Sequence, residues 1–348
     1  MKTLAVVNQK GGCGKTTIAV NMAACIAAGG EKVLLIDMDP QGHASIALGT
    51  NGDQCEPTIY NSLTDEEDNI CSLSSTVIEI GENLWLVPSN IWLSAIEQQL
   101  AGKRGREDRL RDCLVEVVER YDYCIIDCPP SVGLLTMNAL RAAQLALIPI
   151  DMSRFSLHGL QKLTETISVL CSQTSHMVHT RVVANIFDSR TKFAKNMLAS
   201  LQNDLGDNLC KTVIHRCVKV AEAAMLGLPI RKSAPYSSAH EDFADLAMEI
   251  VMNQHLFETP DPFPARVMFS YFAPEAHEVK VAGDFNNWFP SGRYKLRKEQ
   301  DGKWSLFLPL KQGKYRYKFI VDGEWREDPS NPLQELGGFG EKNSVLEI

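Results

Sequence analysis

The first two thirds of the chain alternate short apolar runs with amphipathic stretches. Runs of about four to eight apolar residues between turn residues are typical of strands that are buried on both faces of a sheet. Helical spacing follows most of these runs, and such an alternation predicts a mostly parallel sheet with helices on both faces. We therefore expect a doubly wound α/β domain over residues 1–255. Its predicted strands are residues 4–7, 31–36, 83–90, 124–126, 145–150 and 181–187.

Helices are expected between these strands. An Ala-rich segment without helix breakers follows Thr17, and two long amphipathic helices are predicted between the third and fourth strands. The first of these runs from about Ile91 to the glycine-flanked residues 102–105, and the second covers Glu107–Arg120. A short helix at residues 58–63 and a last one over about residues 239–254 complete the domain.

The pattern changes after residues 256–264, where three prolines predict a short stiff linker. From residue 265 to 348 apolar and polar residues alternate with a period of two, as in VKVAGDF and YRYKFIV, and glycine-containing turns separate the runs. This alternation is typical of strands that bury one face. We therefore expect an all-β, immunoglobulin-like sandwich, with Trp304 in its core.

The strongest chemical motif lies between the first strand and the first helix. There the string NQKGGCGKTT places Gly11, Gly12 and Gly14 in the loop. Glycines let a backbone approach a polyphosphate and direct its amides at it, and a helix N-terminus favours anions. The spacing predicts that Lys15 holds the β- and γ-phosphates of a nucleotide and that the Thr16 hydroxyl binds Mg²⁺.

Carboxylates follow two further strands. Asp37 and Asp39 close the second strand, and Asp127 closes the strand CII. Ligand residues gather at the carboxyl ends of parallel strands, and phosphoryl transfer needs a positioned water and neutralised charge. The alternative for DPQG, residues 39–42, is that it only caps a helix.

Charge and cysteine usage limit the possible function classes. The net charge is −8, and from Asp261 onward acidic and basic residues are equal in number. The excess acid in the first domain argues against a general nucleic-acid binder but leaves room for a local basic patch. The ten cysteines are scattered, which suits reduced thiols. Without an N-terminal signal segment or an apolar run that could cross a bilayer, a cytoplasmic protein is expected.

Five strings resemble the ParA/MinD family of ATPases with a deviant Walker A loop. They are KGGCGKTT (10–17), DMDPQG (37–42), YDYCIIDCPPSVG (121–133), DSRT (188–191) and KTVIHRCVKVAEAAMLGLPI (211–230). The resemblance implies a dimer with ATP between its subunits, in which Lys10 reaches the partner's nucleotide and residues 128–131 form a switch loop. It also implies that Asp39 positions the attacking water. The expected site residues are Lys10, Lys15 and Asp39 for catalysis, Gly11, Gly12, Cys13, Gly14, Lys15, Thr16, Thr17 and Asn185 for ATP, and Thr16, Asp37 and Asp127 for Mg²⁺.

For Asn185 the resemblance implies contact with the adenine base, and the alternative is a buried side chain that satisfies backbone groups. The resemblance further implies non-specific DNA binding by Arg190, Arg216 and Lys219, although His215 and Cys217 replace residues usual in the family. The alternative is an ordinary solvated face. A ParB-like activating protein and the nucleoid are the implied partners, and no membrane-binding C-terminal helix is seen.

The strings VAGDFNNW, GKYRYKFIVDGEW and DPSNP resemble the glycogen-binding module of AMP-activated protein kinase beta subunits, a family 48 carbohydrate-binding module. The resemblance covers residues 265–348. Trp288 and Trp325 match its stacking tryptophans, Lys318 its hydrogen-bonding lysine, and Asn343 its C-terminal polar residue once an insertion at 337–340 is allowed. An α-glucan such as glycogen is the implied ligand, and the alternative is a protein-docking domain.

Together these features predict a slow, Mg²⁺-dependent ATPase that dimerises, positions DNA or another cargo and carries a glucan-binding module. The alternative is a nucleotide-switched scaffold that positions glycogen or carbohydrate enzymes without binding DNA. A reductase or metal-insertion relative would need paired cysteines at a dimer axis, and the sequence offers no convincing pair.

Overall fold

The structure is a computed structural model that describes residues 1–51, 54–174, 176–258, 265–299, 301–310, 312–336 and 342–348. The chain forms two compact units, one built mainly of residues 1–262 and the other mainly of residues 263–348. Within the described part of the chain, no helix combines the length and the apolar character that a membrane span requires.

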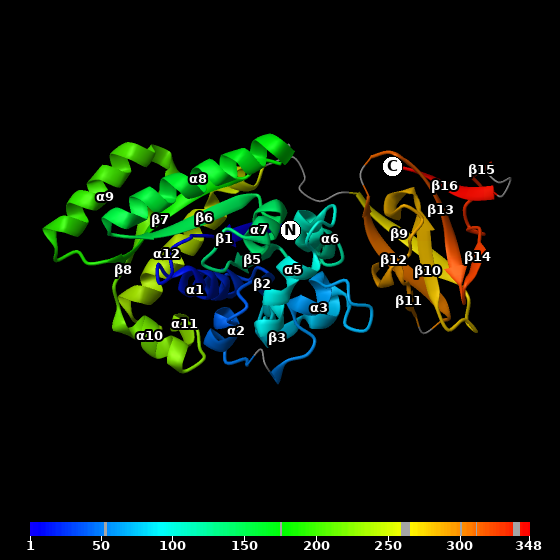
Figure 1. Ribbon diagram of the computed structural model, residues 1–348. Coiled ribbons are helices and arrows are strands. Elements are labelled where there is room, and N and C mark those ends of the chain that lie inside the picture. The colour runs from blue at the N-terminus through cyan, green and yellow to red at the C-terminus, as the bar shows by residue number, and fades with distance from the viewer. Residues whose placement is uncertain (52–53, 175, 259–264, 300, 311, 337–341) are drawn as a thin grey trace. The chain divides into compact units, whose positions relative to one another are not determined.

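The first unit is built on an eight-stranded sheet with the order β3-β4-β2-β5-β1-β6-β7-β8 (Figure 1). Every neighbouring pair is parallel except β3 and β4, which confirms the predicted doubly wound, mostly parallel fold. The antiparallel edge strand β3 is not predicted from the sequence, because its four residues are only partly buried and carry little pattern. The strands are β1 (Lys2–Val6), β2 (Val33–Asp37), β3 (Ile78–Gly81), β4 (Leu84–Val87), β5 (Tyr123–Asp127), β6 (Leu145–Asp151), β7 (His179–Phe187) and β8 (Leu209–His215).

Helices cover both faces of this sheet. The helices α1 (Lys15–Ala28) and α12 (Ser238–Met252) lie on one face, and α8 (Arg154–Thr174) and α9 (Lys192–Leu205) lie on the other (Figure 1). Ile18 and Phe243, both fully buried, join the strands in one core. The other helices are α2 (His43–Ala47), α3 (Ile59–Leu63), α4 (Leu73–Thr76), α5 (Ile96–Gln99), α6 (Arg109–Leu114), α7 (Leu134–Ala142), α10 (Val218–Met225) and α11 (Ile230–Ser233). Short 3₁₀ turns are η2 (Ile91–Ala95), η3 (Arg106–Asp108), η4 (Gly206–Asn208) and η5 (Gln254–Phe257).

The two long helices predicted over residues 91–120 are wrong. The chain forms η2 and α5, then turns, η3 and α6, and α6 ends at Leu114. Gly102 and Gly105 have φ of 74° and 70°, which interrupts the helical path. The segment VEVV that follows Leu114 contains three β-branched residues, which lower helix propensity, and it forms tight turns instead.

The predicted linker is also wrong in its first two residues. Leu256 and Phe257 lie in η5 and are 1 % and 7 % exposed. The Phe257 ring meets Tyr123 edge-on, with ring centroids 6.0 Å apart. The first unit therefore extends past residue 255, and the prolines of the linker lie outside the described residues.

The second unit is a sandwich of two antiparallel sheets, as predicted. One sheet has the order β10-β13-β16-β15 with β14 paired to β13, and the other has the order β11-β12-β9. Phe269 and Phe319, one from each sheet, lie in the core between them with Trp304, which is 4 % exposed as expected. The strands are β9 (Ala265–Phe272), β10 (Val279–Gly283), β11 (Arg297–Lys298), β12 (Lys303–Leu310), β13 (Lys314–Val321), β14 (Glu324–Arg326), β15 (Gln334–Leu336) and β16 (Lys342–Glu347), with the 3₁₀ turns η6 (Asp284–Asn286) and η7 (Gly292–Tyr294).

Candidate functional site

The glycine loop after β1 opens onto free space. Gly12 and Gly14 have φ of 75° and 86°, which side-chain-bearing residues rarely adopt. A Cβ built at Gly11 or Gly12 would meet no atom within 4 Å, so the described residues leave room beside this part of the loop, which we call the glycine cradle. The helix α1 begins directly afterwards and has no side-chain cap, which leaves its first amides available to an anion.

Polar side chains converge beside this cradle. Lys15 is 7 % exposed, and its Nζ donates to the Lys10 carbonyl at 3.3 Å. The Thr16 hydroxyl donates to Asp127 Oδ2 at 2.7 Å. The other carboxyl oxygen of Asp127, Oδ1, is buried and has no hydrogen-bond partner among the described residues. The site therefore holds an unpartnered carboxyl oxygen next to a hydroxyl, two groups that could bind a cation.

The three predicted carboxylates lie together, because β2 and β5 are neighbours and Asp37 is in register with Asp127. Asp37 accepts hydrogen bonds from the Ser45 amide and hydroxyl, both at 2.8 Å, and from the Asp39 amide at 3.1 Å. Asp39 is 6 % exposed and accepts from the Gln41 amide at 2.9 Å. Asp37 thus fixes the loop and the first turn of α2, whereas the N-cap residue of α2, Gly42, provides no side-chain cap. The role of Asp37 towards Mg²⁺ stays a prediction.

Burial and mutual repulsion raise the pKa values of these acids. Burial raises the pKa of Asp37 to about 6, and burial together with the charge of Asp37 raises the pKa of Asp127 well above its usual value. No group of three or more His, Cys, Asp or Glu side chains among the described residues forms a metal cage. Mg²⁺ keeps several waters and binds through one or two protein oxygens plus phosphates, and the Asp127 oxygen and the Thr16 hydroxyl are such oxygens. The residues present therefore fit Mg²⁺ bound with a nucleotide.

Lys10 lies at the same edge but bonds within its own chain. Its Nζ is 2.6 Å from Asp151 Oδ2, 3.0 Å from Ser153 Oγ and 3.4 Å from Ser156 Oγ. Burial tends to raise the pKa of Asp151, but hydrogen bonds from Lys10, Ser156 and Ser153 hold it below its usual value. Asp151 was not predicted as a site residue. Its position directly after the predicted strand 145–150 is the signal that could have found it.

Asn185 contacts the phosphate loop itself. This side chain is 3 % exposed, and its Nδ2 donates to the Cys13 carbonyl at 2.7 Å. A Cβ on Gly14 would collide with the same amide. Asn185 therefore satisfies a buried backbone group, as the alternative expects, and contact with adenine stays a prediction.

The loop at residues 128–133 leads into α7 and is fixed at its end by Glu97. This carboxylate accepts from the Leu134 amide at 2.7 Å, at the first turn of the helix. The Thr136 hydroxyl donates back to the Ser131 carbonyl at 2.5 Å. Glu97 was not predicted as a capping residue of α7, because a cap that comes from a distant segment leaves no local sequence pattern.

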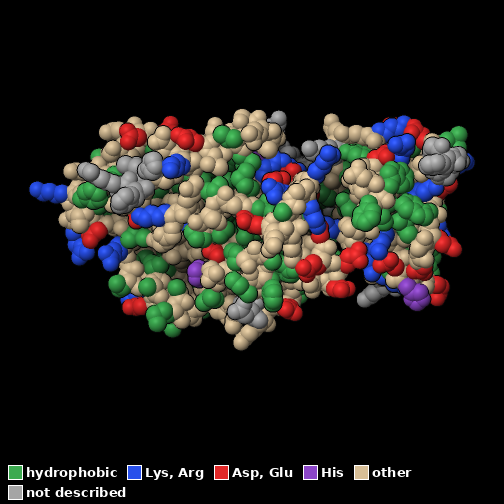
Figure 2. All heavy atoms as spheres, in the orientation of Figure 1, with side chains coloured by type: hydrophobic (Ala, Val, Ile, Leu, Met, Phe, Trp, Pro, Cys, Tyr) green, Lys and Arg blue, Asp and Glu red, His purple; other side chains and the backbone are tan. Residues whose placement is uncertain are grey.

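The predicted DNA-contacting residues all lie on the surface, but two of them are paired. The Arg190 guanidinium, whose side chain is 84 % exposed, binds Asp188 through Nε and Nη2, at 2.8 and 2.7 Å. The hydrogen bonds from Arg190 lower the pKa of Asp188 to about 2. Arg216 is exposed and forms no ion pair within the described part of the chain. Figure 2 shows Lys and Arg side chains near the end of this unit where α9 and β8 lie, among a few acidic ones.

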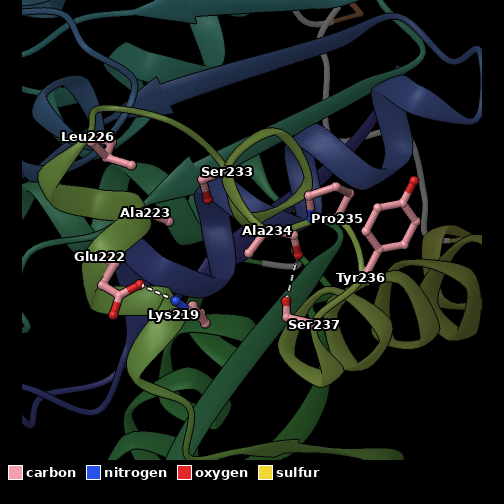
Figure 3. A pocket seen from close by; sticks show the side chains of 9 residues that line it. All are labelled: Lys219, Glu222, Ala223, Leu226, Ser233, Ala234, Pro235, Tyr236 and Ser237. Carbon is pink, nitrogen blue, oxygen red and sulfur yellow. Dashed lines mark hydrogen bonds and ion pairs between the residues drawn. The ribbon is translucent and has the colours of Figure 1, made fainter.

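Lys219 lies at the rim of a surface pocket of about 470 Å³. Its Nζ is 2.7 Å from Glu222 one turn further along α10 (Figure 3). The rest of the lining is mostly apolar, and Tyr236 in it is 98 % exposed. The Lys219 charge is therefore partly neutralised within the protein.

The four predicted carbohydrate residues gather on one face of the second unit. Trp325 pairs with Ile320 across β14 and β13, so it shares a face with Lys318 two residues away. Ser344 pairs with Tyr317, which places Asn343 beside Lys318 on that same face. The rings of Trp288 and Trp325 have centroids 6.2 Å apart and planes inclined by 37°.

Two polar side chains on this face have little exposed surface. Lys318 is 9 % exposed and Asn343 is 4 % exposed. Neither side chain forms a hydrogen bond or ion pair to any described residue. Polar groups beside two tryptophans are typical of a ligand site. The insertion invoked at residues 337–340 lies outside the described residues.

Comparison with known protein families matches both units. Residues 1–180 match the family model of an AAA domain, and residues 265–348 match the model of the glycogen recognition site of AMP-activated protein kinase. The sporulation initiation inhibitor protein Soj of Bacillus subtilis is 39% identical over 253 residues, which cover 72% of this chain and 99% of Soj. The chromosome-partitioning ATPase Soj of Treponema pallidum is 38% identical over 251 residues, 72% of this chain and 97% of that protein.

Solved structures share the fold of the first unit. Cobyrinic acid a,c-diamide synthase from Mycobacterium smegmatis, with a bound ATP analogue and magnesium, superimposes with a TM-score of 0.63 at 27% identity, over 73% of this chain and 95% of that chain. Apo McdA from Cyanothece has a TM-score of 0.65 at 24% identity, over 72% and 99%, and shares the fold. The relatives match over nearly their full length, and the glycine cradle and the strand-end carboxylates are consistent with them. The chain therefore belongs to the ParA/MinD-type family of ATPases and continues into a module of the glycogen-recognition family.

Proposed function

We propose that the first unit binds ATP with Mg²⁺ and hydrolyses it slowly to ADP and phosphate. The observation that carries the proposal is the unpartnered Asp127 Oδ1 beside the Thr16 hydroxyl, at the open glycine cradle. An ATP analogue with magnesium in the cobyrinic acid a,c-diamide synthase structure supports it. The test is nucleotide titration with and without Mg²⁺: Thr16→Ala should weaken binding only when Mg²⁺ is present.

Each residue of the site has a defined task in this reaction. Lys15 and the loop amides hold the β- and γ-phosphates, while Thr16 and Asp127 hold the metal shell. Bound Mg²⁺ would neutralise charge that develops on the phosphate oxygens. Asp39 orients the water that attacks the γ-phosphorus as the bond to ADP breaks. Asp39→Ala should therefore bind ATP and fail to hydrolyse it.

Dimerisation with ATP sandwiched between two copies is the finer part of the proposal. Lys10 would leave Asp151 of its own chain and contact the partner's nucleotide. The Asp39→Ala variant, which keeps ATP intact, should sediment as a dimer with ATP and Mg²⁺. A variant that stays monomeric under these conditions would refute the sandwich.

DNA binding in the ATP state is proposed for the same unit. Arg216 is exposed and unpaired within the described part of the chain. It lies near the pair of Arg190 and Asp188, and its charge helps to lower the pKa of Asp188. The Treponema relative is a chromosome-partitioning ATPase, which supports this assignment. Retention of random-sequence duplex DNA on a filter should require ATP and fall with added salt. If DNA retention persists after Arg190→Ala and Lys219→Ala are combined, these two residues do not contribute to DNA binding.

Glucan binding is proposed for the face that carries Trp288, Trp325, Lys318 and Asn343. Sugar rings present apolar faces to aromatic plates and hydroxyls to polar groups, and the unpartnered Lys318 and Asn343 supply such groups. Migration in a native gel cast with glycogen should be retarded, and Trp288→Ala should abolish the retardation. Free migration of the wild type would leave the module as a protein-docking domain.

A second function combines the two sites without DNA. The pairing of Arg190 with Asp188 and of Lys219 with Glu222 favours a cytoplasmic, nucleotide-switched scaffold that positions glycogen or carbohydrate enzymes. A pull-down with the hydrolysis-blocked Asp39→Ala variant would trap the ATP state. Recovery of an activating, ParB-like protein together with DNA supports partitioning, whereas recovery of carbohydrate enzymes without DNA supports the scaffold.

A further inference from the structure

The loop that carries Trp288 has an unusual backbone. Asn287 and Trp288 have φ of 52° and 61°, in the left-handed region that non-glycine residues rarely adopt. The Trp288 amide donates to the Gly283 carbonyl at 2.9 Å. The Asn286 side chain accepts from the Gly283 amide at 2.9 Å and donates to the Val281 carbonyl at 3.1 Å. These bonds fix the path of the backbone but leave the indole free to rotate about its side-chain bonds.

The indole is fixed by one carboxylate. Trp288 Nε1 donates to Asp284 Oδ1 at 3.0 Å. Asp284 is in turn held by Arg316, whose amide and Nε donate to Oδ2 at 2.9 and 3.1 Å and whose Nη2 donates to Oδ1 at 3.2 Å. Both oxygens of the carboxylate are therefore occupied from fixed directions, and the carboxylate has little freedom to turn.

Arg316 links this clamp to the rest of the face. It precedes Lys318 by two residues on β13, so both side chains extend from the same side of the strand. Burial tends to raise the pKa of Asp284, but bonds from the Arg316 side chain and amide and from Trp288 keep it below its usual value. The clamp therefore stays ionised at neutral pH, as a charge-assisted bond requires.

We propose that Asp284, clamped by Arg316, is the positioning residue that sets the tilt of Trp288 against Trp325, and that this tilt selects a curved glucan chain. Coplanar aromatic plates suit a flat β-1,4-linked chain, whereas the 37° between these two rings suits the bend between successive sugars of an α-1,4-linked chain. The assignment rests on the proposed glucan binding and adds a residue that does not itself touch the sugar.

The tilt is measurable without sugar. Two indoles 6.2 Å apart couple excitonically and give a paired band in the far-ultraviolet circular dichroism spectrum. Because Trp85, Trp92 and Trp304 also contribute, the band is isolated as the difference between the full chain and its Trp325→Phe variant. Asp284→Ala should abolish or invert this difference band, whereas Asp284→Asn, which keeps an oxygen for the indole, should retain most of it.

A matched control is available in the same module. Glu278 pairs with Lys280 and Lys295, at 3.1 Å each, and has no bond to a tryptophan, so Glu278→Ala should leave the difference band unchanged. A band that is unchanged in Asp284→Ala overturns the proposal. A band that Glu278→Ala changes equally would show general loosening of the module and would overturn it as well.

Binding is measured by titrating the full chain with a linear α-1,4 maltooligosaccharide. Loss of the bond that orients Trp288 predicts about tenfold weaker binding for Asp284→Ala. Smaller losses are expected for Arg316→Ala, which keeps the carboxylate, and for Asp284→Asn, which keeps one oxygen but not the charge. Unchanged affinity in Asp284→Ala despite an altered band overturns the link between tilt and selection, as does equal affinity of the wild type for a β-1,4 oligosaccharide. If the wild type binds neither sugar, the proposed glucan function fails, and the selection of a curved chain fails with it. The circular dichroism difference band then decides by itself whether Asp284 orients Trp288.

Discussion

Lys10 and Asp151 form an ion pair within one chain, with Nζ and Oδ2 2.6 Å apart, although 141 residues separate them in sequence. The side chains are 35% and 25% exposed, so water weakens the pair without abolishing it. The proposed dimer needs this same ammonium at the partner's nucleotide. The pair within the chain therefore competes with assembly.

Removal of the competing carboxylate should promote assembly. For Asp151→Ala we expect the midpoint of ATP-dependent dimerisation to move to about three- to tenfold lower protein concentration, because Lys10 no longer has to leave a partner. Sedimentation velocity with ATP and Mg²⁺ measures this. Lys10→Ala is the control and should stay monomeric. An unchanged or higher midpoint for Asp151→Ala would contradict the competition.

Asp37 should give the fold a specific dependence on pH. Burial raises its pKa from an ordinary 3.8 to about 6, so the folded protein binds this proton more tightly than the unfolded chain does. The stability due to the protonated group is fully present below about pH 4 and is lost as the pH rises through about 6. The free energy of unfolding of the wild type relative to Asp37→Asn should therefore fall by on the order of 3 kcal/mol between pH 4 and 7.

Urea titrations of both proteins without Mg²⁺ and nucleotide measure this difference. Groups whose pKa values do not depend on Asp37 cancel in this difference, whereas the pKa of Asp127, which the charge of Asp37 raises, contributes to it. A difference that is flat across this range would show that folding does not change the pKa of Asp37.

Gly14 should tolerate no side chain, for two separable reasons. Its φ of 86° costs an alanine about 1–2 kcal/mol, and the added Cβ would also collide with the amide of Asn185. Gly14→Ala should thus lower the free energy of unfolding by more than the backbone cost alone. In the background of Asn185→Ala the same substitution should cost only about 1–2 kcal/mol. Equal costs in both backgrounds would exclude the collision.

The paired cations should limit DNA binding. Glu222→Gln frees Lys219 and Asp188→Asn frees Arg190, so each should strengthen retention of non-specific DNA about two- to tenfold at low salt. Arg216→Ala should weaken retention and reduce the salt-dependence slope by about 0.9, as expected for one lost phosphate contact. Glu241→Gln, an exposed acid on α12, is the charge-matched control. If all three acid substitutions strengthen binding equally, only net charge matters, and the pairs have no specific role.

The sequence by itself determined the elements whose chemistry is local. The string from β1 through Gly14 to Lys15 specifies strand, phosphate loop and helix, because glycine conformations and the helix start depend on adjacent residues. The period of two after residue 265 likewise determined a sandwich with Trp304 inside it. The same reasoning failed over residues 91–120, where β-branched residues and tertiary packing outweighed an amphipathic pattern.

Only the tertiary structure decided which partners the site residues have. Asn185 bonds to the Cys13 carbonyl although 172 positions separate them in sequence. Lys10 pairs with Asp151 because β6 lies next to β1. Asp284 bonds to Arg316 because β10 pairs with β13. Local spacing carries no record of strand order. The sequence therefore determined the groups that can hold a nucleotide or a sugar, and the order of strands in each sheet determined which of them are already bonded to one another.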